Sequence, residues 1–250
     1  MMLDINEMRF SYRSREILRD ITLGLERDDI LSILGPNGVG KTTLLKCING
    51  ILKSRSGTIL VDNDDLRELT RTEIARRIGY VPQRGEVSMI TVFDAVLLGR
   101  RPYISWDVTR KDIEMTQEAI ERLGLSDISL SPIGEISGGE HQKVQIARAL
   151  VQEPKILLLD EPTSSLDLSN QHRIMDAVTD VVREKHLSAV MTMHDLNLAL
   201  RYSNKFIMLK DGEIYAAGDH EIMTPENIEA VYGLAVDVAE YRGHAVVIPV

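Results

Sequence analysis

The sequence predicts an α/β fold with a central, mostly parallel sheet covered by helices, an N-terminal antiparallel β subdomain and an inserted helical subdomain. Residues 30–34 and 156–159 are short, wholly apolar runs, as found in strands that are buried on both faces. Around residues 8–12 and 21–25, apolar side chains alternate with polar ones, as in half-buried antiparallel strands. Residues 91–122 change to a helical spacing of apolar side chains.

Composition and charge limit the possible functions. The chain has 250 residues, of which 44% are hydrophobic, enough for one large domain with a buried core. No apolar run is long enough to span a membrane, and residues 1–10 lack the pattern of a secretory signal, so we expect neither a span nor export by that route. The formal charge of −9 disfavours a nucleic-acid partner. We expect Cys47, the single cysteine, to pack rather than react.

A phosphate-binding pattern follows the first apolar run. Residues 35–43 match G-x-x-x-x-G-K-[ST] at every fixed position, and a helix over residues 42–49 can follow. The members are Gly35, Pro36, Asn37, Gly38, Val39, Gly40, Lys41, Thr42 and Thr43. The glycines let backbone N–H groups turn inward, Lys41 supplies charge to the β- and γ-phosphates, and Thr42 supplies a hydroxyl to Mg²⁺. The preceding strand and following helix disfavour the alternative, a glycine-rich turn beside a surface lysine.

Two isolated residues in the first third of the chain are also candidates. Tyr12 ends an alternating stretch beside a polar turn, where its ring could stack on a flat base, although an aromatic residue in a strand is usually packed. Gln83 follows a predicted strand over residues 77–81, and its amide could reach a metal ion and an attacking water. It could equally be an ordinary polar loop residue, and spacing alone does not decide.

Residues 137–140, Ser-Gly-Gly-Glu, fit the start of a helix that runs to about residue 151. Ser137 can cap this helix while Glu140 returns to the N–H group of the cap. Capping does not explain Gly138 and Gly139, since each glycine costs a helix about 1 kcal/mol relative to alanine. We therefore expect a ligand to approach the backbone closely here.

Polar side chains follow two further predicted core strands. Asp160 and Glu161 directly follow the run at residues 156–159, at the end of a strand where parallel sheets carry their sites. Asp160 would approach Mg²⁺, and Glu161 could deprotonate a water that attacks the γ-phosphate. His194 ends the strand predicted over residues 189–193. A lone histidine is most often structural, but its place near a phosphate loop and a carboxylate pair favours catalysis.

Together these motifs resemble those of the ATP-binding subunits of ABC transporters over nearly the whole chain. They occur in the family's order: phosphate loop, Gln loop (Gln83), LSGGQ-type signature (residues 136–140), strand with Asp160 and Glu161, Asp loop (Asp167) and switch histidine (His194). The resemblance implies ATP and Mg²⁺ as cofactors on a P-loop NTPase core. It also implies that Tyr12 stacks on adenine, that His194 contacts the γ-phosphate, and that Thr42, Gln83 and Asp160 face the metal.

The resemblance further implies an assembly. Two chains would pair head to tail as a homodimer and close two ATP molecules between the phosphate loop of one chain and Ser137, Gly138, Gly139 and Glu140 of the other. ATP hydrolysis by the dimer would drive a polytopic permease, to which an extracytoplasmic substrate-binding protein delivers the cargo. The chain would bind this permease and lie peripherally at the cytoplasmic face of the membrane. No nucleic-acid partner is expected.

We expect one ABC ATPase domain in three parts. Residues 1–83 and 152–220 would form the nucleotide-binding core with its antiparallel β subdomain, residues 84–151 the helical subdomain, and residues 221–250 a C-terminal extension. Near Gln83, residues 84–103 combine apolar side chains with arginines, a composition suited to docking a permease. The apolar set is Val87, Met89, Ile90, Val92 and Phe93, and the arginines are Arg84, Arg100 and Arg101. The alternative is that Val92, Phe93, Val96 and Leu97 hold the insert to its own core.

Residues 91–103, 161–167 and 193–199 are similar to those of importers of iron-siderophore, haem and cobalamin type. Alternatives are an oxyanion importer, a soluble ABC ATPase of chromosomes or ribosomes, and an unrelated P-loop kinase or switch. The sequence lacks the long coiled coil of the chromosome type, and a kinase would not need the signature or Asp loop. Two positions depart from the family: Val39 replaces the commoner serine and Glu140 the commoner glutamine. The carboxylate of Glu140 would repel the partner's γ-phosphate unless capping or a cation offsets its charge.

Overall fold

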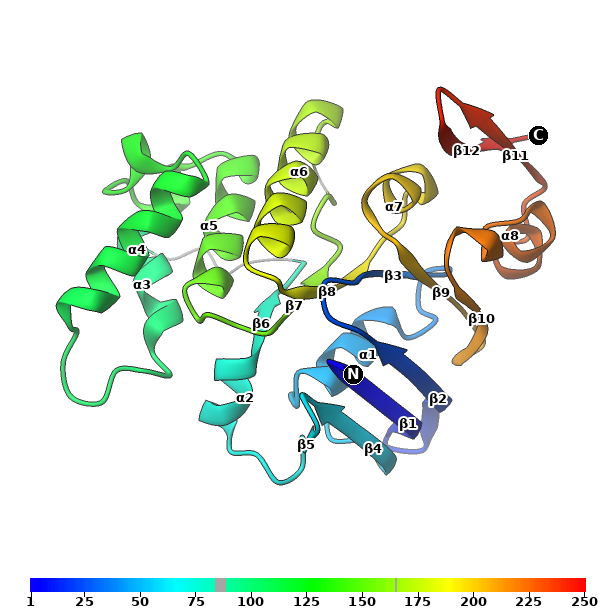
Figure 1. Ribbon diagram of the computed structural model, residues 1–250, viewed down its shortest axis with the longest axis horizontal. Coiled ribbons are helices and arrows are strands. Elements are labelled where there is room, and N and C mark those ends of the chain that lie inside the picture. Colours follow the sequence, from blue (N-terminus) through cyan, green and yellow to red (C-terminus); the bar gives the residue numbers. More distant parts are fainter. Residues whose placement is uncertain (84–88, 165) are drawn as a thin grey trace. The chain divides into compact units, whose positions relative to one another are not determined.

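The computed structural model describes residues 1–83, 89–164 and 166–250, which divide into two compact units (Figure 1). The first unit comprises Met1–Leu69 and Ser188–Val250, and the second comprises Thr70–Leu187. The predicted helical subdomain, residues 84–151, lies inside the second unit, and its boundaries stay a prediction. In the part of the chain that is described, no helix is long and apolar enough to cross a membrane.

An antiparallel sheet forms the N-terminal part of the first unit. Its strand order is β2-β1-β4-β5, with β1 at Leu3–Tyr12, β2 at Arg15–Leu25, β4 at Ser56–Val61 and β5 at Asp64–Asp65. In β1, Met8 and Phe10 are buried whereas Arg9 is exposed. The alternating pattern therefore marks a half-buried sheet, as predicted.

The remaining strands of the first unit include the parallel strands that carry the phosphate loop. The strand β3 (Ile30–Leu34) lies between β8 (Ser188–Thr192) and β9 (Lys205–Lys210) and is parallel to both. All residues of β3 and β8 are buried, because neighbours cover both faces of these strands. The strand β10 (Glu213–Gly218) pairs antiparallel with β9 and forms a hairpin with it.

Three α-helices, a one-turn helix and a short hairpin complete the described part of this unit. They are α1 (Lys41–Ile48), α7 (Leu196–Tyr202), the one-turn helix η4 (His220–Ile222), α8 (Pro225–Tyr232), and the strands β11 (Val236–Tyr241) and β12 (His244–Pro249). Cys47 in α1 is buried, and burial raises the pKa of its thiol to about 12, which agrees with a packing role. The strands β11 and β12 pair antiparallel and hold the C-terminus of the chain (Figure 1).

The second unit is mainly helical. Its strands β6 (Ile78–Val81) and β7 (Ile156–Asp160) are parallel neighbours. Its helices are α2 (Arg71–Arg77), α3 (Val92–Leu97), η1 (Leu98–Arg100), α4 (Arg110–Arg122), η2 (Ser126–Ile128), η3 (Ile133–Glu135), α5 (Gly138–Leu150) and α6 (Leu168–Glu184). Figure 1 shows α3, α4 and α5 packed together as the helical insert. The predicted fold class is thus confirmed.

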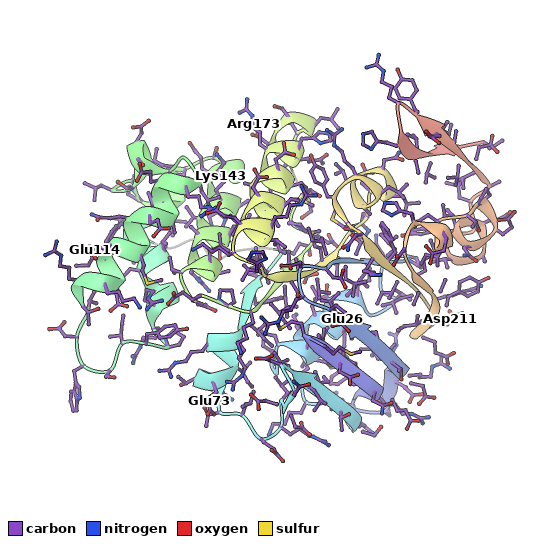
Figure 2. The ribbon with its side chains drawn as sticks, viewed as in Figure 1. Glu26, Glu73, Glu114, Lys143, Arg173 and Asp211 are labelled. Carbon is purple, nitrogen blue, oxygen red and sulfur yellow. The ribbon has the colours of Figure 1, made fainter. Side chains whose placement is uncertain are left out.

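Exposed side chains of the second unit include charged residues and one large aromatic. Glu114 on α4 and Arg173 on α6 point outward in Figure 2, and both are exposed. Trp106, in the loop before α4, is 100% exposed. An isolated exposed apolar residue is common on protein surfaces and by itself identifies no site.

The position of Arg100 contradicts its prediction as part of a docking rim. The residue is only 2% exposed. Its Nε lies 2.9 Å from Oδ1 of Asp112, and its Nη1 donates to the carbonyl of Val151 at 2.6 Å. Arg100 therefore links η1 to α4 and to the C-terminal end of α5. A charge this deeply buried needs a charged partner and hydrogen bonds, and these contacts provide both.

The other residues of the predicted docking region differ in exposure. Val92 and Val96 are fully buried, so for these two the alternative of internal packing is correct. Met89 is 90% exposed, and Arg101 is also exposed. Ile90, Phe93 and Leu97 are half-buried. Arg84 and Val87 lie outside the described residues.

We expect the substitution Arg100→Ala to destabilise the fold strongly. Asp112 would keep its hydrogen bond from Thr109 Oγ1 (2.6 Å) but would lose its counter-charge, and removing one partner of a buried ion pair costs about 3–5 kcal/mol. Urea unfolding of the variant measures this loss. Arg110→Ala is the control, because its ion pair with Glu114 is exposed and such pairs contribute about 0–1 kcal/mol. Equal losses in the two variants would contradict the role of Arg100.

Candidate nucleotide-binding site

The phosphate loop connects β3 to α1 through three glycines with positive φ. The φ angles of Gly35, Gly38 and Gly40 are 142°, 79° and 116°. A Cβ atom on Gly35 would lie 2.5 Å from the carbonyl oxygen of Leu209, and one on Gly40 would lie 2.8 Å from Leu18 Cδ2. Backbone conformation therefore requires glycine at both ends of the loop, and at Gly35 the lack of space beside a backbone oxygen requires it as well.

Lys41 places its ammonium group inside this loop. Its Nζ donates to the carbonyl of Gly35 at 2.7 Å and to that of Pro36 at 3.1 Å, and the residue is only 5% exposed. The charge is thus held by backbone oxygens at the centre of the turn. This is where the phosphate-binding pattern requires a cation.

The start of α1 differs from the other α-helices that the structure describes. A side chain caps each of the helices α2 to α8, whereas none caps α1, which begins after Gly40 and has no acidic residue in its first turn. Thr42 and Thr43 are half-buried in this turn. Pro36 and Val39 are half-buried and Asn37 is exposed. Uncapped N–H groups beside a buried lysine fit the phosphates of a nucleotide.

Tyr12 and His194 belong to the same unit as the loop. Tyr12 is 46% exposed, and its ring meets that of Phe10 edge to face with centroids 4.8 Å apart. His194 is exposed and lies two residues beyond the end of β8, the parallel neighbour of β3. The phosphate loop and His194 therefore leave the sheet at the same edge, as parallel strands require.

The second unit brings Gln83 together with the predicted carboxylates. The strands β6 and β7 end at the same edge, where Val81 pairs with Leu159. The amide of Gln83 donates a hydrogen bond to the carboxylate of Glu161. Asp160 is only 3% exposed. The hydrogen bond joins Gln83 to a predicted carboxylate, and the role of Gln83 in the site stays a prediction.

The backbone of Glu161 is in an uncommon conformation. Its φ angle is 49°, in the left-handed region that non-glycine residues seldom adopt. Such strain persists only where the surrounding structure enforces it, and it is concentrated at functional sites. Glu153 and His186 of the same unit share this conformation, so it does not by itself distinguish Glu161.

Tyr80 is a member of this group that sequence reasoning missed. Its hydroxyl lies 3.4 Å from Oδ2 of Asp160, at the weak end of hydrogen-bond distances. Burial, and then the charge of Asp160, raise the pKa of Tyr80, so the hydroxyl keeps its proton and acts as a donor. A tyrosine inside a strand gives no signal of this role in the sequence.

The signature residues form the predicted capping box at the start of α5. Ser137 Oγ donates to Glu140 Oε2 at 2.7 Å, and the N–H group of Ser137 donates to the same oxygen at 2.8 Å. These bonds, followed by the charge of Lys143, lower the pKa of Glu140, so the carboxylate stays ionised at neutral pH. A Cβ on Gly138 would meet no atom within 4 Å, so packing within this unit does not require this glycine.

Asn170 on α6 lies near both the Asp loop and the signature of the same chain. Asp167 caps α6 by accepting from the N–H group of Asn170 at 2.8 Å, and the side chain of Asn170 donates back to Asp167 at 3.0 Å. A Cβ added to Gly139 would lie 3.6 Å from this Asn170 side chain. Asn170 therefore lies between the two motifs, a position that the sequence did not reveal.

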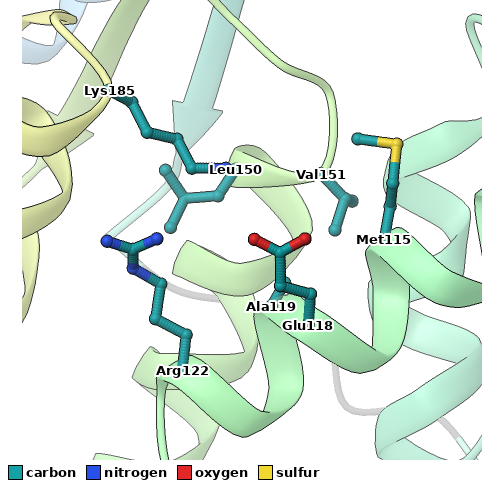
Figure 3. A pocket seen from close by; sticks show the side chains of 7 residues that line it. All are labelled: Met115, Glu118, Ala119, Arg122, Leu150, Val151 and Lys185. Atoms are coloured by element: carbon teal, nitrogen blue, oxygen red, sulfur yellow. The ribbon is translucent and has the colours of Figure 1, made fainter.

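A small pocket elsewhere in the second unit is no alternative site. Figure 3 shows its lining, which is Met115, Glu118, Ala119, Arg122, Leu150, Val151 and Lys185. Its volume of about 20 Å³ accommodates about one water molecule. Among the described residues, no group of three or more His, Cys, Asp or Glu side chains could hold a metal ion.

Comparisons with known sequences agree with these motifs. The family model described as ABC transporter matches residues 18–164. An uncharacterized ABC transporter ATP-binding protein of Methanocaldococcus jannaschii is 54% identical over 250 residues, which cover 100% of this chain and 98% of the relative. An ATP-binding protein of Helicobacter pylori named for iron chelatin transport is 36% identical over 252 residues, covering 99% of each chain.

Comparisons with solved structures agree with the fold. An inward-facing ABC transporter assigned to the metal-chelate type has a TM-score of 0.86 at 30% identity, over 100% of this chain and 96% of that chain. A dimeric bacterial ABC transporter cassette has a TM-score of 0.78 at 28% identity, over 87% of this chain and 98% of that chain.

Proposed function

We propose, from the premise that this chain belongs to the ABC transporter family, that it hydrolyses ATP to drive uptake of a metal chelate through a partner permease. The observation that carries the ATPase part is the buried Lys41 in a glycine loop at the one uncapped α-helix start of the described chain. The cargo part rests on relatives named for iron chelatin transport or assigned to the metal-chelate type. Iron-siderophore, haem and cobalamin complexes are the cargo types we propose.

The phosphate loop and Tyr12 would bind the nucleotide. Lys41 and the N–H groups of the first turn of α1 neutralise and orient the phosphates. The exposed ring of Tyr12 stacks on the adenine. Thr42, Asp160 and Gln83 would hold Mg²⁺, which offsets phosphate charge when bound.

Glu161 would be the general base. Its carboxylate accepts a proton from the attacking water, and the hydrogen bond from Gln83 fixes the direction in which it points. In the same way, the hydroxyl of Tyr80 would orient the carboxylate of Asp160. His194 contacts the γ-phosphate from the loop that follows β8.

ABC cassettes form dimers and work with permeases in transport complexes. We propose that two copies of this chain close ATP between the phosphate loop of one and the signature of the other. The empty space around Gly138 supports this role, because a phosphate could approach the start of α5 there. The chain would then be a peripheral protein at the cytoplasmic face of the membrane. Its ATP hydrolysis would drive uptake of the cargo that an extracytoplasmic binding protein delivers to the permease.

The first test concerns the base. Glu161→Gln should keep nucleotide binding and lose hydrolysis by at least about 10²-fold, since the amide cannot accept the proton of water. Phosphate release is measured beside a nucleotide titration on the same preparation. Glu114→Gln, an exposed change on α4, is the control. Turnover close to wild type in Glu161→Gln would remove Glu161 from this role.

The second test concerns the composite site. Lys41→Ala and Ser137→Arg should each be inactive alone, because one lacks the phosphate ligand and the other blocks the signature. When the two variants are mixed, hydrolysis should return, since one site of each mixed dimer combines an intact loop with an intact signature. Specific activity of the wild type should also rise with protein concentration. No rescue by two folded variants would count against the ATP sandwich.

The third test concerns the permease. Met89 is 90% exposed in the predicted docking region, and a charge there should weaken an apolar contact. Met89→Glu should therefore leave the ATPase activity of the isolated chain unchanged while abolishing pull-down by the permease and uptake of the labelled chelate. Val250→Glu, at another exposed apolar position (81%), is the control. Unchanged uptake by Met89→Glu would show that the permease docks elsewhere.

A further inference from the structure

The C-terminal extension, residues 221–250, contacts the phosphate loop and α7 of its own unit. It contains α8 and the hairpin β11–β12, and it belongs to the first unit together with the phosphate loop and His194. None of the functions proposed above uses it. One of its contacts reaches the first residue of the phosphate loop, and a second holds the extension itself in place.

The first contact joins α8 to the phosphate loop. The N–H group of Gly35 donates to the hydroxyl of Tyr232 at 2.8 Å. The strand β3 ends at Leu34, so Gly35 is the first residue beyond the strand, and the tyrosine supplies the acceptor for its N–H group. Burial raises the pKa of Tyr232 to about 12, so its hydroxyl is neutral at any physiological pH.

Gly35 links this contact to the phosphate ligand. Its carbonyl accepts the hydrogen bond from Lys41 Nζ at 2.7 Å. The carbonyl of Leu209 leaves no space for a Cβ on its other side. The N–H group held by Tyr232 and the carbonyl that holds Lys41 are thus on the same residue, so that a rotation of this glycine would displace the ammonium group.

Tyr232 is itself held in a defined place. Thr224 caps the start of α8, and Gly233, with a φ angle of 70°, ends the helix directly after Tyr232. The hairpin that follows is anchored to α7, because the side chain of Asn197 donates to the carbonyl of Val247 at 3.2 Å and accepts from its N–H group at 2.8 Å. A side chain fixed at both ends of its element can orient a backbone group, whereas a mobile one cannot.

We propose that the C-terminal extension positions the phosphate loop for nucleotide binding, with Tyr232 as the positioning residue that orients Gly35. This inference rests on the proposed nucleotide binding but not on the cargo, the permease or the dimer. Without the hydroxyl, the N–H group of Gly35 loses its acceptor, and the free loop populates orientations in which Lys41 is displaced. The nucleotide then has to reorder the loop, which weakens its binding.

The test compares Tyr232→Phe with Tyr215→Phe. Tyr215 on β10 is the matched control, because it is 47% exposed. Loss of its hydroxyl leaves no buried group without a partner, since water can take its place. Isothermal titration with MgADP, well below the unfolding temperature, should give a Kd about tenfold higher for Tyr232→Phe and an unchanged Kd for Tyr215→Phe. A merely structural role would lower the unfolding temperature of Tyr232→Phe and leave its Kd for MgADP unchanged, and that result would overturn the proposal.

A second measurement uses the wild-type protein alone, without nucleotide and without any substitution. In the wild-type protein without nucleotide, the amide proton of Gly35 should exchange slowly with solvent, as expected for a donor bonded to a fixed tyrosine. Rapid exchange at Gly35 would overturn the contact. If uptake of chelate failed in cells while MgADP binding and the Tyr232→Phe effect were as expected, the importer proposal would fail and the role of Tyr232 would stand.

Discussion

Lys41 keeps a positive charge where only 5% of the residue meets solvent, and the carbonyls of Gly35 and Pro36 stabilise it there. A buried ammonium group is costly unless such oxygens surround it. The loop can supply them only in one set of turns, and these turns need glycine at both ends. The buried strand β3 determines where the loop begins, and α1 determines where it ends. The architecture of the first unit follows from holding this one charge at the edge of a sheet.

The strands, helices and motif loops could be predicted because each depends on contiguous residues. An uninterrupted apolar run suffices to predict β3 or β7, since a strand buried on both faces needs nothing else. The capping box of Ser137 and Glu140 closes within four residues, so its geometry was also predictable. For the phosphate loop, the required backbone conformations are carried by the glycines themselves.

Residues whose partners are distant in the sequence could not be predicted in this way. Arg100 stands in a segment whose sequence is typical of a surface, yet the residue is buried. It donates a hydrogen bond to a carbonyl that lies 51 positions away in the sequence. Tyr232 and Gly35 are separated by 197 positions. The alternating or helical spacing that reveals burial says nothing about which polar group a buried donor meets. Tertiary structure therefore supplies the positioning residues, whereas the sequence supplies the residues of the motifs.

The exposure of Trp106 has a spectroscopic consequence. It is the only tryptophan in the chain, and it is 100% exposed in the loop before α4. Because the indole is already in contact with water in the folded protein, its emission should barely change when the chain unfolds. Any molecule that covers this loop would instead move the indole into a drier environment and shift its emission to shorter wavelengths. The tryptophan emission of this protein should therefore respond to a molecule that binds at the loop before α4, and should respond little to changes elsewhere in the chain.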